Sequence, residues 1–144
     1  MAEAAVKTPW HLWALGVVSL LWNAYGCYDV YMFKTGAYDY QMRAKQVAYF
    51  QSMPAWAWGA WATCFAAALL GALLLLLRSK GAFYAFAVSF AASTLYSIYL
   101  LVLSNGGEVM GGYVGLLIFN VLIAAVGIFF IWYSRSATKR GILR

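Results

Sequence analysis

The sequence predicts an all-α membrane protein whose four transmembrane helices form an up-down-up-down bundle. Of the 144 residues, 65% are hydrophobic and only 10% are charged, whereas a soluble domain carries roughly 25% charged residues. One membrane crossing needs about 20 mainly apolar residues, so four crossings take roughly 80 to 90 positions. Too few residues remain for a soluble domain, and we therefore expect a single transmembrane domain over residues 1–144.

Four apolar runs define the expected helices, at residues 10–33, 54–77, 82–103 and 112–133. The first run is too long for the apolar core of a signal peptide, and no small-residue cleavage site interrupts it. The second begins at Pro54, which suits the first turn of a helix because its missing N–H needs no partner there. The third ends at turn-forming residues 104–107. A basic tail, residues 134–144, follows the fourth.

Basic residues are distributed unevenly between the two sides of this arrangement. The side with both termini holds seven of the ten, namely Lys7, Arg78, Lys80, Arg135, Lys139, Arg140 and Arg144, and the other side holds Lys34, Arg43 and Lys45. Short loops rich in Lys and Arg remain on the cytoplasmic side of a membrane. The sequence therefore predicts a multi-pass protein with both termini in the cytoplasm.

The longest segment between two predicted helices, residues 34–52, also shows helical spacing. The positions concerned are Tyr40, Ala44, Val47, Ala48 and Gln51. This pattern favours a short helix on the outer membrane surface. An irregular, tyrosine-rich loop packed over the helix ends is the alternative.

Each predicted helix carries a stripe of small or mildly polar residues at spacings of three and four. The stripes are Gly16, Ser19, Asn23, Gly26 and Val30; Gly59, Thr63, Ala67 and Gly71; Ala85, Ser89, Ser93 and Ser97; and Gly112, Asn120, Ala124 and Gly127. Small residues let helices approach closely within lipid. We therefore expect the stripes to form the packed seams of a compact bundle, with a solvated transport path along them as the alternative.

Polar side chains from all four helices come out at a similar depth when residues are counted inward from the outer ends at about 1.5 Å each. An unpaired amide in hydrocarbon costs several kcal/mol, so we expect Asn23 and Asn120 to hydrogen bond to each other. The layer either fixes helix register or forms the floor of a pocket that opens outward. The candidate binding residues are Asn23, Tyr25, Asp29, Thr63, Ser93, Tyr96 and Asn120.

Asp29 is the only ionisable residue clearly within an apolar run. An acid inside a membrane segment is a functional candidate by default. Alternatively, Asp29 is shallow enough to reach interfacial water or to pair with Lys34 or Arg43.

The sequence offers little to catalysis. It contains no nucleophile elbow and no glycine-rich phosphate loop, and the single His11 has no acid or nucleophile at a useful spacing. Cys27 and Cys64 fall in apolar segments, where small polarizable side chains pack well. We therefore expect no enzymatic activity, no metal and no cofactor. Nucleic acid is excluded as a partner because the basic residues form no stripe interleaved with aromatic residues.

Several short motifs carry a resemblance to a known family. They are Leu21-Trp22-Asn23, Gly26, Asp29, Tyr49-Phe50, Met53-Pro54-Ala55-Trp56 and the leucine run that closes at Arg78. The chain resembles an uncharacterised family of small bacterial four-helix inner-membrane proteins, which automated naming often calls sugar transporters. The resemblance implies a location in the bacterial inner (plasma) membrane. The chain is also similar in size to the small multidrug resistance transporters, but it lacks their glutamate in the middle of the first helix.

Two functions of different classes follow from these features. The first is a homo-oligomeric carrier or binder of a small solute or amphiphile at the polar layer. The alternative is a non-catalytic accessory or assembly subunit of a larger membrane complex. Both place the chain in a lipid bilayer with protein partners. Small-residue stripes around a wet pocket favour the carrier, whereas stripes that face outward from a centre filled by bulky residues favour the subunit.

Overall fold

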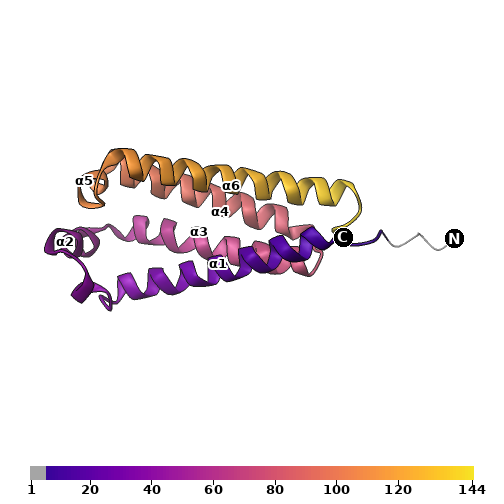
Figure 1. Ribbon diagram of the computed structural model, residues 1–144, viewed down its shortest axis with the longest axis horizontal. Helices are drawn as coiled ribbons and strands as arrows, with labels where there is room; N and C mark the ends of the chain where they lie inside the picture. The colour runs from indigo at the N-terminus through magenta and orange to yellow at the C-terminus, as the bar shows by residue number, and fades with distance from the viewer. Residues whose placement is uncertain (1–5) are drawn as a thin grey trace.

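The computed structural model describes residues 6–144, and all of its regular structure is helical (Figure 1). Its elements are α1 (Trp10–Lys34), the 3₁₀ turn η1 (Asp39–Gln41), α2 (Ala44–Ser52), α3 (Ala55–Leu76), α4 (Gly81–Ile98), the π-helical segment η2 (Tyr99–Leu103), α5 (Gly106–Val109) and α6 (Tyr113–Lys139). No strand occurs within these described residues. The predicted all-α class is therefore confirmed.

Three helical stretches are long and apolar enough to cross a membrane, and they are Ala55–Leu76, Gly81–Leu103 and Tyr113–Lys139. Helix α1 has 25 residues, but polar residues such as Asn23 and Asp29 lower its hydropathy. The three apolar helices are compatible with a membrane protein.

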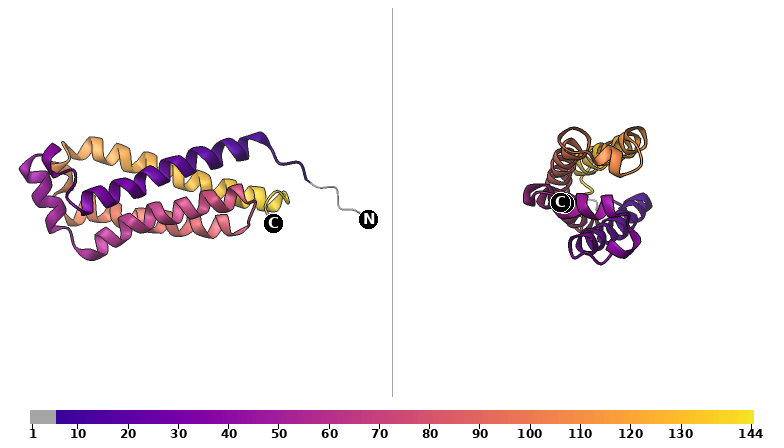
Figure 2. Two further views of the ribbon diagram at one scale, coloured as in Figure 1. Left: turned by 90° about the horizontal axis from the view of Figure 1, so that it is seen from below. Right: turned by 90° about the vertical axis from the view of Figure 1, so that its left-hand side faces the viewer.

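The long helices lie side by side along the longest axis of the molecule (Figures 1 and 2). Helix α1 packs on α3, α3 packs on α4, and α4 packs on α6. Helices α2 and α5 lie at one end, which we call the loop end. The C-terminus, the start of α1 and the α3–α4 turn lie at the other, the terminal end. The packing order of the long helices is therefore α1, α3, α4, α6. Because α1 and α6 are the first and last in this order, each leaves much of its surface without a helix partner.

The packed face of α1 follows the predicted stripe. All five stripe residues are buried, together with Leu12. Glycine is needed for the close approach of α3, because an ideal Cβ on Gly16 would lie 2.5 Å from Leu76 Cδ2, and one on Gly26 would overlap the Phe65 ring. The prediction for this helix is confirmed.

The predicted stripe of α3 is wrong. Gly59 has no neighbouring atom within 4 Å of an ideal Cβ, Thr63 is exposed, and only Gly71 of the predicted set is buried. The buried residues are Ala57, Trp58, Ala60, Ala68, Gly71, Ala72 and Leu75. Helix α3 lies between α1 and α4, so it needs two packed faces, and alanines supply most of both.

The stripes of α4 and α6 meet where Ser97 Oγ donates to Asn120 Oδ1 at 2.6 Å. Ala85 and Ser89 are buried, but the Ser89 hydroxyl donates to the Cys64 carbonyl of α3 at 2.7 Å, so Ser89 faces α3. Asn120 and Gly127 are among the half-buried residues of α6. An ideal Cβ on Gly127 would lie 2.8 Å from Phe90 Cδ2. Gly112 does not belong to this seam, because it precedes α6 and is exposed.

Two boundaries differ from the sequence expectations. Helix α6 continues to Lys139, and the last residues fold back instead of forming a separate tail. The Arg144 N–H donates to the Arg78 carbonyl at 2.7 Å, and the Lys80 N–H donates to the Arg144 carbonyl at 3.1 Å. Ile142 and Leu143 are buried in an apolar cluster with residues of α1, α3 and α4. These two apolar residues turn the end of the basic segment into part of the core.

The predicted helix in the first loop is present as α2, but its inner face differs from the expected one. Tyr49 and Phe50 are its buried residues. Tyr40 precedes the helix and is 82% exposed, and Gln51 is exposed. The two large aromatic side chains bury more apolar area than Ala44 or Val47, and they set the rotation of the helix.

Candidate binding site at the loop end

The two buried amides of the predicted layer do not pair with each other. Asn23 Nδ2 donates to the Ser19 carbonyl at 2.7 Å and to Ser19 Oγ at 3.1 Å, within α1. Asn120 Oδ1 accepts from Ser97 Oγ at 2.6 Å, and its Nδ2 donates to the Leu116 carbonyl at 2.8 Å. Asn23 Nδ2 finds its acceptors in its own helix, and the Asn120 amide finds its partners in its own helix and in α4, because α1 and α6 are not neighbours in the packing order.

The other predicted site residues are also dispersed. Tyr25 is 60% exposed on the outer surface of α1, and Thr63 is exposed on α3. Asp29 accepts a hydrogen bond from the Tyr38 hydroxyl at 3.1 Å. Ser93 lies one turn before Ser97, whose single hydroxyl proton is shared between the Ser93 carbonyl, at 2.9 Å, and Asn120 Oδ1. The structure therefore assembles one polar contact between α4 and α6 and no shared layer among these described residues.

Aromatic side chains fill the loop end of the bundle. Trp61 of α3 stacks on Tyr96 of α4 with centroids 5.3 Å apart and planes 2° from parallel. Phe50 of α2 also stacks on Trp61, with centroids 6.0 Å apart, and its ring lies 4.7 Å from that of Phe33 at the end of α1. The cluster fixes α2 against three of the long helices.

A cavity of about 300 Å³ lies on this aromatic cluster. Its lining residues are Phe33, Lys34, Thr35, Gly36, Asp39, Phe50, Gln51 and Trp58. They come from the end of α1, the loop with η1, α2 and the start of α3. Three aromatic rings therefore share the cavity wall with an ammonium, a carboxylate, an amide and a hydroxyl.

The two charged residues of the cavity have different surroundings. Lys34 Nζ lies 4.9 Å from the centroid of the Trp58 ring, a distance at which the ring face attracts a cation. Asp39 approaches Gly36, and an ideal Cβ there would lie 3.0 Å from Asp39 Oδ2. Gly36 has a φ of +74°, which glycine adopts without strain. Glycine thus provides both the turn and the space for the carboxylate.

Tyrosine hydrogen bonds hold the elements around the cavity. Partial burial, together with the bond to the Asp29 carboxylate, raises the pKa of Tyr38 to about 12. On α2, the Tyr49 hydroxyl shares a hydrogen bond of 2.8 Å with Ser104 Oγ. Burial raises the pKa of Tyr49 to about 12, although the bond to Ser104 acts in the opposite direction. Both phenols are therefore neutral and fixed in position near pH 7.

Sequence reasoning did not assign this group of residues to a site. From the sequence, Lys34 is an orientation signal and a possible partner of Asp29, and no binding role follows for Phe33, Phe50 or Trp58. The available signal was the density of aromatic residues in the segment 49–61 beside a loop with charges of both signs. Tyr96 is the one predicted site residue that contacts the aromatic cluster, through Trp61.

Comparison with known proteins gives no relative for this chain: no family model, curated protein or solved structure matches it significantly.

Proposed function

We propose that this chain is an integral membrane protein with four crossings that binds a small polar solute in the loop-end cavity on the outer side of the membrane. Binding takes place without catalysis. The single observation that carries the proposal is the cavity itself, where Lys34 and Asp39 line the same space as three aromatic rings. Its volume of about 300 Å³ is at the lower end of the range of small-molecule pockets.

The length of α1 supports a fourth crossing. Its 25 residues extend about 37 Å at 1.5 Å per residue, which exceeds a hydrocarbon core of about 30 Å. Its packing along α3 places the two helices side by side. The surplus of basic residues at the terminal end then favours a cytoplasmic location for both termini. With this orientation the loop-end cavity faces the outside of an inner membrane.

The chemistry of the cavity indicates the class of solute. Lys34 and Asp39 form no ion pair with each other in the described chain, so both remain available to a ligand that carries donors and acceptors. The half-buried ring of Phe33 suits an apolar face of the ligand, whereas Phe50 and Trp58 are only 6% and 8% exposed and add little surface. A sugar-sized polyhydroxy compound or a small zwitterion has both properties.

The interior below the cavity supports a binder more than an open path. Trp61 lies 6.0 Å from Phe50 and stacks in turn on Tyr96, and the Ser97–Asn120 hydrogen bond joins α4 to α6 one residue farther along α4. A solute leaves the cavity toward the membrane centre only if these aromatic rings move. We therefore propose binding as the basic activity, with carriage as an extension that requires this movement.

Equilibrium dialysis of the detergent-purified protein against two radiolabelled probes, a hexose and a zwitterionic amino acid, tests the proposal. We expect saturable binding of at least one probe. Removing a charged hydrogen-bond partner costs about 1.5–3 kcal/mol, so Asp39→Asn is expected to weaken binding roughly tenfold to a hundredfold. Trp58→Leu removes the ring beside Lys34 and is also expected to weaken it.

Lys45→Gln is the matched control, because Lys45 is an exposed residue of α2 outside the cavity. It removes the same charge as Lys34→Gln, which is expected to weaken binding while the control does not. Equal effects of the two substitutions, or no saturable binding of either probe, would contradict a site in this cavity.

A second candidate function, an assembly subunit of a homo-oligomer or a larger membrane complex, is supported by α6. None of its most apolar stretch is buried within the chain, and its main helix partner is α4. Purification in mild detergent, followed by identification of the accompanying proteins, tests this alternative. A stoichiometric partner that is lost when Leu122, which is exposed on α6, is replaced by arginine would support it.

A further inference from the structure

A second cavity, of about 360 Å³, lies at the terminal end of the bundle, opposite the proposed solute site. Its lining residues are His11, Leu15, Phe129, Trp132, Tyr133, Ser136, Ala137, Arg140 and Ile142. They come from the first turns of α1, the last turns of α6 and the segment after α6. The cavity thus lies where the two outermost helices of the packing order come closest, through a hydrogen bond between His11 Nδ1 and the Tyr133 hydroxyl.

The cavity changes in character along α6. Arg140, Ser136 and His11 supply the polar groups of the lining, nearer the ends of their helices. Leu15, Phe129 and Trp132, farther along the helices, are apolar. Phe129 precedes Arg140 by eleven residues, so the lining extends about 16 Å along the helix axis. Trp132 is 60% exposed, as expected for a ring at a membrane interface. This order, from guanidinium to aromatic and aliphatic surface, matches an amphiphile with an anionic head.

Among the described residues, the charged side chains in the segments at this end are all basic. Seven basic residues lie in the segments at this end, whereas the acidic residues of the described chain, Asp29, Asp39 and Glu108, belong to segments at or near the loop end. Arg78, next to the cavity, also has a hydrogen-bond donor to spare. Its Nε donates to the carbonyl of Ile142, a lining residue, at 3.0 Å, while its buried Nη2 has no partner in residues 6–144. Within residues 6–144, no aspartate or glutamate belongs to the segments at the terminal end, so these guanidinium groups have no acidic side chain of the described chain to neutralise them.

We propose that this terminal-end cavity binds the phosphate head of an anionic phospholipid, with one acyl chain along Leu15, Phe129 and Trp132. Arg140 provides the charge for the phosphate, and the Ser136 hydroxyl provides an additional donor. Basic pockets between membrane helices on the cytoplasmic side recognise anionic headgroups in this manner. A bound lipid would also add to the contacts between α1 and α6, which include the His11–Tyr133 hydrogen bond and the apolar cluster that Leu12 and Ala137 share.

The experiment measures lipids retained by the full-length protein in native mass spectrometry after reconstitution in an equal mixture of phosphatidylcholine and phosphatidylglycerol. We expect the parent protein to retain phosphatidylglycerol in preference. Arg140→Gln is expected to reduce this retention about fivefold, the effect of one basic residue near an anionic surface. Leu15→Trp fills the cavity without changing charge and is also expected to release the lipid.

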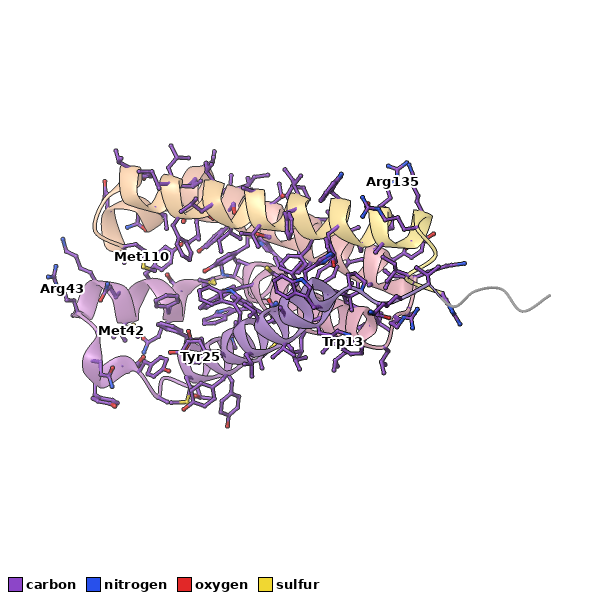
Figure 3. The ribbon with its side chains drawn as sticks, turned by 45° about the vertical axis from the view of Figure 1, so that its right-hand side comes forward. Trp13, Tyr25, Met42, Arg43, Met110 and Arg135 are labelled. Carbon is purple, nitrogen blue, oxygen red and sulfur yellow. The ribbon has the colours of Figure 1, made fainter. Side chains whose placement is uncertain are left out.

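Arg135→Gln is the matched control, since Arg135 lies on the same last part of α6 but projects away from the bundle (Figure 3) and does not line the cavity. Preferential retention that survives Arg135→Gln but not Arg140→Gln or Leu15→Trp supports the proposal. Equal losses in both arginine variants indicate general surface charge and overturn it. Equal retention of the two lipids by the parent overturns it as well.

Inorganic phosphate distinguishes a lipid from a soluble anion. If phosphate alone protects the parent protein from thermal unfolding and phosphatidylglycerol does not, the site takes a free anion, and the lipid assignment is wrong. Helix content measured by circular dichroism shows whether Leu15→Trp has folded. If Leu15→Trp does not fold, Ser136→Phe provides the second test of a filled cavity.

Discussion

The ring of Phe65 on α3 lies directly against the backbone of Gly26 on α1, in the space that any larger side chain at position 26 would occupy. Within lipid there is no hydrophobic effect to bring helices together, and close packing takes its place. The α1–α3 contact depends on this pair and on the similar pair of Gly16 and Leu76. Helix α1 is thus attached through glycines that its own sequence supplies.

Substitution of Gly26 by alanine is expected to destabilise the protein by about 1–3 kcal/mol, the usual cost of overpacking, because the Phe65 ring has to move. Unfolding in mixed detergent micelles, followed by circular dichroism, measures the change. Gly59→Ala is the control in α3, where an ideal Cβ meets no atom within 4 Å. It is expected to leave stability unchanged or to raise it by up to about 1 kcal/mol. Equal losses in the two variants would contradict the packing.

The hydrogen bond between Ser97 and Asn120 is expected to give a measurable coupling energy. Polar contacts between membrane helices average about 0.6 kcal/mol in double-mutant cycles, with a maximum of about 1.7 kcal/mol. A cycle of Ser97→Ala and Asn120→Ala is therefore expected to fall in this range. The cycle of Asn23→Ala and Asn120→Ala is expected to be additive within about 0.3–0.5 kcal/mol. A coupling energy between Asn23 and Asn120, with none between Ser97 and Asn120, would support the contact that the sequence predicts and contradict the structure.

Alkaline pH is expected to loosen the loop end through Tyr49. Its pKa in the folded protein, about 12, lies above the ordinary tyrosine value of about 10. The neutral phenol therefore stabilises the fold fully below about pH 10, and this contribution is lost as the pH rises toward 12. Melting temperatures measured from pH 8 upward should fall less steeply for Tyr49→Phe than for the parent. Parallel curves would show that Tyr49 does not titrate in this way.

Single cysteines test the orientation of the bundle. In a background without Cys27 and Cys64, Lys45→Cys on α2 is expected to react with a membrane-impermeant thiol reagent added to intact cells. Lys139→Cys, at the end of α6, is expected to react only after the membrane is opened. Both residues are exposed in the structure, so a failure to react reports the side of the membrane. Labelling of position 139 in intact cells would contradict the predicted orientation and would indicate that the loop-end cavity faces the cytoplasm.

Much of the helical framework was predictable from local sequence. The expected run 10–33 corresponds to Trp10–Lys34, and the expected run 82–103 corresponds to Gly81–Leu103. The buried face of α1 was also predictable, because this helix packs chiefly on one other helix, α3, and needs a single stripe of small residues. For these features the signal lies within one segment of the chain, as the length of an apolar run or the spacing of glycine and serine along a helix.

The tertiary structure decided which faces meet and where cavities remain. Helix α3 packs on two helices, so the single stripe of small residues in its sequence predicted the wrong buried face. Asn23 and Asn120 reach a similar depth, yet their helices are not adjacent, so depth alone could not pair them. The loop-end cavity unites Lys34, Phe50 and Trp58 from three elements, and the terminal-end cavity unites His11 with Arg140 across almost the whole chain. Such sites depend on the order in which helices pack, which periodicity within a single helix does not encode.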